Sequence, residues 1–192
     1  MNEALRCIND SRVAHSDFAK QVDCILKALH CIRDDYQEAA NKHDDSNPEE
    51  QLKKLLHLIH VEKSQLAQDI VLKLLNEGIE LIFDYPLKKL ASYGTLRPGE
   101  SNYKVVSDIK GNWVDGVIHG TTNTHRGYPV FKWTEPGADV SVQILCSEML
   151  PSEVKRVDEF EGADYIRTLI PVYVQDEVWV CNVYEQSDQV PN

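Results

Sequence analysis

Hydrophobic residues in the first part of the chain recur at the spacing expected of two long amphipathic helices. The first stripe consists of Phe18, Val22, Ile25, Leu26, Leu29 and Ile32. The second consists of Leu52, Leu55, Leu56, Ile59, Leu66, Ile70 and Leu74. Ser16 suits the N-cap of the first helix, and the Asn-Pro-Glu-Glu sequence at residues 47–50 suits the start of the second. We expect Gly78 to end or kink the second helix and Pro86 to close the helical part.

From about Leu90 the pattern changes to short alternating or apolar runs, which indicate strands. The expected strands cover residues 88–93, 103–110, 113–120, 128–134, 139–146, 166–174 and 178–184. A helical pattern at residues 151–160 interrupts them, and the Gly-Asn pair at 111–112 is expected to turn a hairpin. Several short strands with one helix among them predict a small, mixed, barrel-like domain, so the fold class is α+β.

The change of pattern divides the chain into two expected domains. Residues 1–87 form a helical region, a hairpin of long amphipathic helices, and residues 88–192 form the barrel domain. The apolar stripes of the hairpin need to be covered by the other helix, by the barrel domain or by a second copy of the chain. A homodimer through the helical region is therefore one of the expected arrangements.

Charge and composition narrow the range of partners. The chain has 31 acidic and 20 basic residues, a net charge of −11, and its longest basic stretches are pairs of lysines. We expect no nucleic acid partner, because phosphate binding requires clustered Lys and Arg. No apolar run approaches the roughly 20 residues that span a bilayer, and the amino terminus lacks the pattern of a signal peptide. We therefore expect a cytoplasmic protein without a membrane partner.

Cysteines and histidines offer little metal or redox chemistry. The five cysteines stand at irregular spacings without a Cys-x-x-Cys pair, and we expect all of them to be free thiols. His57 and His60 lie three residues apart on a predicted helix. A zinc site needs three or four converging ligands, and no further set is evident, so no metal site is predicted.

The first candidate site is a glycine-containing turn at the end of a predicted strand. Residues 93–99 read Tyr-Gly-Thr-Leu-Arg-Pro-Gly. Because glycine has no Cβ, backbone N–H groups in such a turn can approach a carboxylate or a developing oxyanion closely. A simple corner between a strand and a loop is the alternative interpretation, since glycine turns are common.

The second candidate site is an acidic helix end followed by a new strand. Asp158, Glu159 and Glu161 lie at the C-terminal end of the predicted helix, where the helix dipole disfavours carboxylates. Such a position can raise a carboxyl pKa toward neutrality, as a general base requires. Tyr165 and Arg167 enter the next strand and would bring a phenol and a guanidinium near Glu161. A solvated acidic turn with ordinary strand decoration is the alternative.

Taken together, the motifs resemble one family. They occur in the order Tyr-Gly-Thr-Leu-Arg-x-Gly, then Gly116 with Val117 and Gly120, then Tyr128 with Pro129, and finally Asp-Glu-Phe-Glu-Gly-x-x-Tyr-x-Arg. This set resembles the γ-glutamylcyclotransferase superfamily, and in particular its AIG2-like and γ-glutamylamine cyclotransferase branch. The resemblance covers roughly residues 89–186. It implies a compact β-barrel with flanking helices.

The resemblance also implies roles for individual residues. Glu161, the glutamate immediately before a glycine, corresponds to the catalytic base. The residues that correspond to the family's substrate-binding loop and pocket are Tyr93, Gly94, Thr95, Leu96 and Tyr165. Asp158 and Glu159 are interpreted as helix-end residues rather than catalysts.

The implied activity is that of a cyclotransferase acting on a small-molecule γ-glutamyl amine or γ-glutamyl peptide. Its products are 5-oxoproline and the free amine, and the reaction needs neither a metal nor an organic cofactor. The alternative is a catalytically silent protein that keeps the fold for binding or regulation and uses its helical region for dimerisation or partner docking. Retention of Glu161, Tyr165 and the complete motif at residues 93–99 favours the enzyme.

Overall fold

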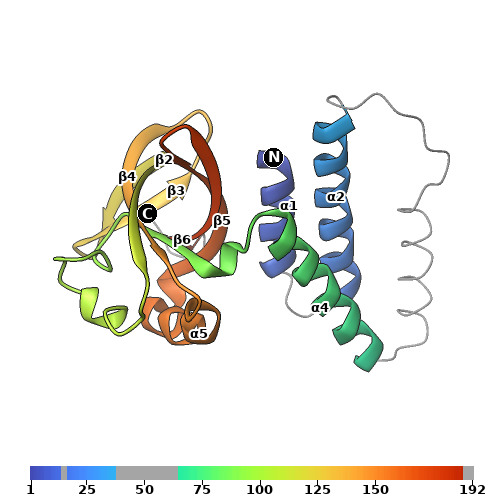
Figure 1. Cartoon of the computed structure of the whole chain (residues 1–192), viewed down its shortest axis with the longest axis horizontal. Coiled ribbons are helices and arrows are strands. Elements are labelled where there is room, and N and C mark those ends of the chain that lie inside the picture. The colour runs from blue at the N-terminus through green and yellow to red at the C-terminus, as the bar shows by residue number, and fades with distance from the viewer. Residues whose placement is uncertain (14–16, 38–64, 188–192) are drawn as a thin grey trace. The chain divides into compact units, whose positions relative to one another are not determined.

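The computed structural model describes residues 1–13, 17–37 and 65–187. The chain forms two compact units, Met1–Ile79 and Glu80–Asn192. The described part of the first unit is helical, and strands form the main body of the second (Figure 1). The division falls near the end of a helix, a few residues before the boundary expected at residues 87 and 88.

The helical unit contains one helix that the sequence did not predict. Its helices are α1 (Asn2–Val13), α2 (Phe18–Gln37) and α4 (Gln65–Ile82), of which the last continues into the second unit. α1 packs on α2, and its buried residues include Ala4, Leu5 and Ile8. This stripe is short and lies among polar residues, so its periodicity alone was too weak to indicate a helix. Packing against α2 supplies the missing stabilisation.

The buried face of α4 differs from the expected one. The packed cluster between α2 and α4 consists of Phe18, Val22, Leu26, Val71, Leu72 and Leu75. Ile70 and Leu74, predicted to lie on the apolar stripe, are 50% and 61% exposed among the described residues, so α2 does not cover them. α4 carries apolar residues on more than one side, and the position of α2 decides which side is covered.

Two other expectations concern the ends of these helices. Gly78 does not end α4, which continues to Ile82, so the expectation that this glycine ends the helix was wrong. A single glycine costs a helix only about 1 kcal/mol, which packing can offset. The N-cap at Ser16 and the helix start at residues 47–50 lie outside the described residues.

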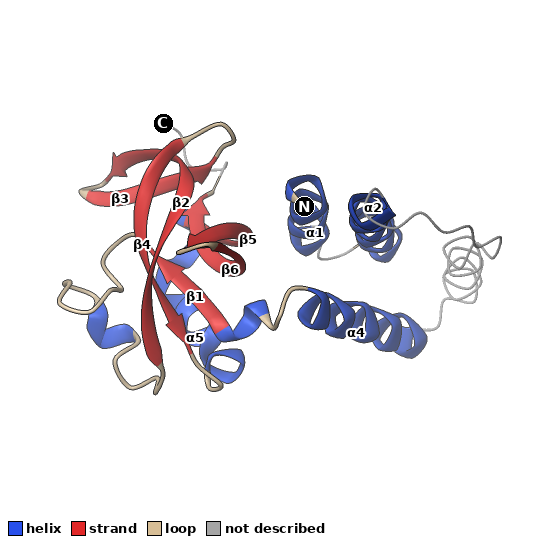
Figure 2. Cartoon of the chain, turned by 45° about the horizontal axis from the view of Figure 1, so that its top comes forward, coloured by secondary structure: helices blue, strands red, loops and turns tan. Residues whose placement is uncertain are grey.

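Strands of the second unit close into a small barrel (Figure 2). They are β1 (Lys89–Ser92), β2 (Asn112–His125), β3 (Tyr128–Trp133), β4 (Ala138–Cys146), β5 (Tyr165–Val174) and β6 (Glu177–Gln186). The sheet order is β3-β2-β4-β1-β6-β5, and an additional pairing of Val117 with Tyr173 joins β2 to β5. Five strands therefore form the closed barrel, and β3 extends β2 as a hairpin. Because β1 runs parallel to β6 while the other pairs are antiparallel, the barrel is mixed, which confirms the predicted α+β class.

Residues 103–110 are not the strand that their alternation predicted. They form a 3₁₀ helix, η2 (Tyr103–Val105), followed by turns. Val106 N–H donates to the Tyr103 carbonyl at 3.0 Å, and Ile109 N–H donates to the Val106 carbonyl at 3.1 Å. Val106 and Ile109 are both buried in one hydrophobic cluster. Apolar residues at every third position therefore lie on one side of this segment. Over so few residues, that spacing resembles the alternation of a strand.

Helix α5 (Leu150–Glu161) lies beside one end of the barrel in both views (Figures 1 and 2). Its Leu150 and Val157 are buried in a cluster with Leu90 of β1. Gly162 follows the helix with a φ of 68°, and its N–H donates to the Asp158 carbonyl. Glycine reaches this left-handed conformation without a steric penalty, so the helix stops there. Glu161 is consequently the last helical residue, at a defined position beside β1.

Candidate active site

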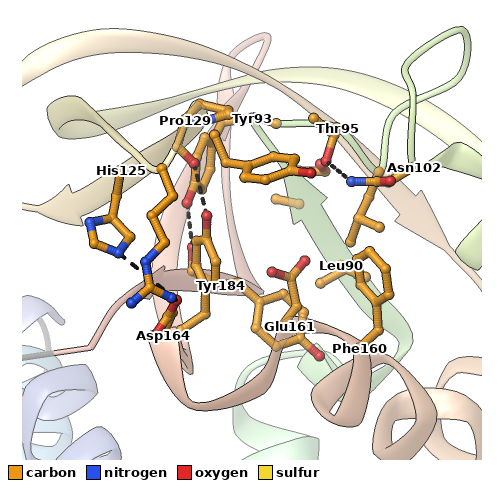
Figure 3. A pocket seen from close by; sticks show the side chains of 17 residues that line it. Leu90, Tyr93, Thr95, Asn102, His125, Pro129, Phe160, Glu161, Asp164 and Tyr184 are labelled. Atoms are coloured by element: carbon orange, nitrogen blue, oxygen red, sulfur yellow. Dashed lines mark hydrogen bonds and ion pairs between the residues drawn. The ribbon is translucent and has the colours of Figure 1, made fainter. Parts of the chain in front are cut away.

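A pocket of about 390 Å³ lies in the second unit, where the end of β1, the β2–β3 hairpin and the end of α5 meet. Figure 3 shows the side chains that line it. All residues that the sequence assigned to the site are among them, namely Tyr93, Gly94, Thr95, Leu96, Glu161 and Tyr165. The fold thus brings together two motifs that are more than sixty residues apart in the chain.

The turn after β1 leaves its N–H groups available. In its own hydrogen bonds the turn supplies the acceptor. The Thr95 carbonyl accepts from Asn102 N–H at 3.1 Å, and the Gly94 carbonyl accepts from Arg97 Nε at 3.1 Å. Thr95 Oγ1 also accepts from Asn102 Nδ2 at 2.9 Å (Figure 3). Within the described residues, no backbone hydrogen bond has Gly94, Thr95 or Leu96 as its donor. This turn can therefore bind an oxygen ligand through its main chain.

Tyr93 forms one wall of the pocket and stays a neutral phenol. Its hydroxyl donates to the Tyr184 carbonyl at 2.9 Å, and its ring lies 5.3 Å from the ring of Phe131. Burial raises the pKa of Tyr93 far above its ordinary value. The side chain consequently supports the pocket as a hydrogen-bond donor and an apolar surface, not as a proton acceptor.

Glu161 is the titratable group at the centre of the site (Figure 3). Burial raises its pKa to about 7, because the carboxylate loses hydration there. The sequence attributed such a rise to the helix dipole, whereas burial is the cause in the structure. A carboxyl group with this pKa can accept a proton near neutral pH and then donate it again.

Tyr165 and Arg167, separated by one residue in the predicted motif, lie in different places relative to the pocket. Tyr165 lines the pocket, and its hydroxyl donates to the Pro129 carbonyl at 3.4 Å. Arg167 does not line the pocket, so its guanidinium is not part of the site as Tyr165 is. Its Nε donates to Asp158 Oδ1 at 2.8 Å. Alternate residues of a strand point to the same face, so Tyr165 and Arg167 leave β5 on the same side. The ion pair with Asp158 of α5 then directs the Arg167 guanidinium away from the pocket.

Several pocket residues were not identified as site residues from the sequence. The side chains that complete the lining include Asn102, His125, Arg126, Asp164 and Tyr184. Arg126 pairs with Asp164 at 3.0 Å, which joins the tip of the β2–β3 hairpin to the segment after α5. The Arg-Gly pair between two strand-like runs is a usable hairpin signal, since Arg126 and Gly127 both have positive φ. No local pattern indicates what the tip of that hairpin contacts.

Metal and membrane features can be described for part of the chain only. In residues 1–13, 17–37 and 65–187, no three His, Cys, Asp or Glu side chains gather so that they could hold a metal ion. His57 and His60 lie outside those ranges. None of the described helices combines the length and apolar character needed to cross a bilayer. All five cysteines are free thiols in the structure.

A comparison with protein families agrees with the site's composition. The family model "Gamma-glutamyl cyclotransferase, AIG2-like" matches residues 90–192, which is more than half of the chain. The chain belongs to this family. Within the AIG2-like match lie the turn after β1, the β2–β3 hairpin and Glu161, whereas the helical unit lies outside it. No curated protein matches the chain.

Solved structures similar to this γ-glutamyl cyclotransferase family member cover about half of it. An AIG2-like protein from Mus musculus is 23% identical, with 54% of this chain and 80% of that one covered and a TM-score of 0.44. A protein from Arabidopsis thaliana is 24% identical, with coverage of 54% and 64% and a TM-score of 0.43. An uncharacterized protein from Pyrococcus horikoshii is 19% identical, with coverage of 54% and 81% and a TM-score of 0.42.

Proposed function

We propose that the chain is a cyclotransferase that converts a γ-glutamyl amine or γ-glutamyl peptide into 5-oxoproline and releases the amine. The observation that carries the proposal is Glu161, a carboxyl group with a pKa of about 7 in a pocket that it shares with the turn of Gly94–Leu96. Membership of the γ-glutamyl cyclotransferase, AIG2-like family supports this class of reaction.

Glu161 acts as the general base in this proposal. The α-amino group of a γ-glutamyl substrate is an ammonium ion near neutral pH and must lose a proton before its nitrogen can attack. An ionised Glu161 accepts that proton, and its pKa of about 7 keeps a large fraction of the carboxyl group ionised near neutral pH. The freed nitrogen then forms a bond to the γ-carbonyl carbon of the same molecule.

The turn after β1 holds the substrate in the shape needed for ring closure. Nucleophile and electrophile belong to one molecule, so the pocket accelerates the reaction mainly by folding the γ-glutamyl chain into its attack geometry. Negative charge develops on the γ-carbonyl oxygen during the attack. The backbone N–H groups of Gly94, Thr95 and Leu96, which serve no described backbone hydrogen bond, are the donors that stabilise it.

The second half of the reaction breaks the bond between the γ-carbon and the leaving nitrogen. The carbonyl re-forms, and the protonated Glu161 gives its proton to the leaving nitrogen. The extra proton of the new ring nitrogen also passes to the released amine, which departs as an ammonium ion. The products are 5-oxoproline and an amine, and no water, metal or redox partner takes part. Glu161 returns to its ionised form at the end of the cycle.

The direct test is a screen for 5-oxoproline release by the intact chain. Substrates are γ-glutamyl amines, γ-glutamyl dipeptides and glutathione, and the product is measured by chromatography with mass detection. We expect release from at least one class. If no substrate yields 5-oxoproline above the rate without protein, the fold serves binding or regulation instead.

A further inference from the structure

The pocket has a charged side that the proposed chemistry does not use. Its members are His125 and Arg126 at the tip of the β2–β3 hairpin and Asp164 in the segment after α5, here called the rim cluster. Figure 3 shows Glu161 between Thr95 on one side and His125 with Asp164 on the other. The turn of Gly94–Leu96 and the rim cluster thus lie on opposite sides of the carboxyl group.

This arrangement gives the reacting groups of a γ-glutamyl substrate and its leaving amine different surroundings. In the proposed function, the turn of Gly94–Leu96 binds the γ-carbonyl oxygen and Glu161 contacts the α-nitrogen. The remaining bond of the γ-carbonyl carbon leads to the nitrogen of the leaving amine. On the side away from the turn, that amine and its substituents meet the rim cluster and the exposed ring of Tyr128.

Arg126 is the one permanent cation at this pocket. Among the described residues that line it, no other Lys or Arg occurs. Arg97, next to the turn of Gly94–Leu96, does not line the pocket, because it donates to the Gly94 carbonyl and pairs with Glu100. The Arg126 side chain is 72% exposed, and it contacts Asp164 through a single nitrogen, Nη1, at 3.0 Å. A guanidinium has five N–H donors, so Arg126 retains donors for a second carboxylate.

His125 is placed to replace Arg126 at Asp164. Its Nε2 is buried, has no hydrogen-bond partner among the described residues, and lies 3.9 Å from the Asp164 Oδ2 that Arg126 contacts. Leaving a buried polar atom without a partner is unfavourable, so a small movement that joins Nε2 to Asp164 would be favourable. When Arg126 turns away toward a ligand, His125 can therefore keep the Asp164 carboxylate paired.

We propose that Arg126 determines the leaving-group specificity of this site by binding a carboxylate on the released amine, while His125 takes its place at Asp164. The inference rests on the proposed function and narrows its substrate class to γ-glutamyl compounds whose leaving amine carries a carboxylate beside the nitrogen. Amines without that carboxylate lack a group for Arg126 to bind and react less efficiently.

A pair of substrates that differ only in this carboxylate tests the proposal. γ-Glutamyl-L-alanine and γ-glutamylethylamide share every other heavy atom, and kcat/KM is measured for both by 5-oxoproline release. We expect the unmodified chain to favour the alanine compound by about 10- to 100-fold, the size of one or two hydrogen bonds to charged groups. Arg126→Gln should reduce this ratio to about one, and Arg126→Lys should retain part of it.

Two further variants separate the proposed roles. His125→Leu removes the replacement partner of Asp164, so Arg126 stays engaged there and the ratio should fall several-fold although Arg126 is present. Lys155→Gln is the matched control, since it removes one positive charge from an exposed position on α5 that does not line the pocket. It should keep the full ratio. Unchanged preference in His125→Leu would refute the exchange at Asp164.

Each remaining outcome is decisive. Release from both substrates with a ratio that Arg126→Gln leaves unchanged overturns the leaving-group proposal, while the cyclotransferase function stands. The same conclusion follows if the unmodified chain favours the ethylamide, or if Arg126→Gln lowers both reactions equally. Failure of the unmodified chain to release 5-oxoproline from any γ-glutamyl compound overturns the proposed function, and this inference falls with it.

Discussion

The phenol of Tyr184 donates a hydrogen bond to Asp158 Oδ1 at 2.7 Å and so ties β6 to the last turn of α5. Arg167 of β5 donates to both oxygens of the same carboxylate, at 2.8 and 3.3 Å. Asp158 therefore holds the end of α5 against two strands of the barrel. Glu161 follows within the next turn, so its position depends on this contact.

Replacing Asp158 with Ala should destabilise the barrel unit and disturb the site. The change removes the acceptor for Tyr184 and Arg167, and leaves two part-buried donors to find other partners. We expect the free energy of unfolding to fall by about 1–3 kcal/mol in urea titrations. Asp139→Ala is the control, because its side chain is 82% exposed and its ion-pair partner among the described residues is His119, and it should cost less than about 0.5 kcal/mol. Equal losses in the two variants would contradict the anchoring role of Asp158.

Glu161→Gln should abolish most 5-oxoproline release without unfolding the protein. Glutamine keeps the size of the side chain but cannot accept the ammonium proton, so kcat/KM should fall by about 10²- to 10⁴-fold. Glu159→Gln is the matched control, two residues earlier on α5, exposed and outside the pocket lining, with a minor expected effect. Equal turnover by Glu161→Gln and the unmodified chain would show that another group is the base.

The rate should depend on pH through the ionisation of Glu161. A general base must be ionised, and the pKa of this carboxyl group is about 7. We therefore expect kcat/KM to rise about tenfold per pH unit below pH 6 and to level off above about pH 8. An ordinary carboxyl base would give a plateau already near pH 5.5. A flat profile between pH 5.5 and 8 would argue against the buried carboxyl as the base.

Stability should reveal the same pKa without any substrate. Because the folded-state pKa of Glu161 lies above the ordinary value, the folded protein prefers the protonated carboxyl group. Ionisation of Glu161 therefore lowers the free energy of unfolding. This loss is absent below about pH 4.5, grows as the pH rises, and is complete above about pH 7. Glu161→Gln removes it and should gain on the order of 1–2 kcal/mol relative to the unmodified chain at pH 8, after allowance for partial exposure. A Tm difference that does not change from pH 4.5 to 8 would refute the shift.

Gly120→Ala should be strongly destabilising. Gly120 lies on β2 opposite Trp133, and an added Cβ would overlap the Lys132 carbonyl oxygen and the Phe131 ring. Overpacking of this kind costs about 1–3 kcal/mol or more and should lower the melting temperature measured by circular dichroism. Gly78→Ala in α4 is the contrasting variant, because its new Cβ meets no described atom within 4 Å apart from the adjacent backbone of α4, and helix propensity improves. A Gly120→Ala protein as stable as the original would mean that β3 adjusts freely.

Local pattern in the sequence determined most of the elements and the two motifs of the site. Alternation identified five of the six strands to within a few residues, although it cut β2 short, and the helical pattern at residues 151–160 lies within α5. The pattern at residues 88–93 likewise predicted β1. These successes share a cause: side-chain periodicity and turn residues act over a few positions, so they are visible in a single stretch of chain.

Tertiary structure alone decided which residues meet. Arg126 reaches Asp164 and His125 approaches the same carboxylate only because barrel closure places the β2–β3 hairpin beside the end of α5. The raised pKa of Glu161 likewise comes from burial by residues distant in the chain and not from its place at a helix end. The exposure of Ile70 and Leu74 was also decided by tertiary packing. Several faces of α4 are apolar, and α2 packs against one of them. Contacts between distant segments depend on how the whole chain closes, and no local pattern contains that information.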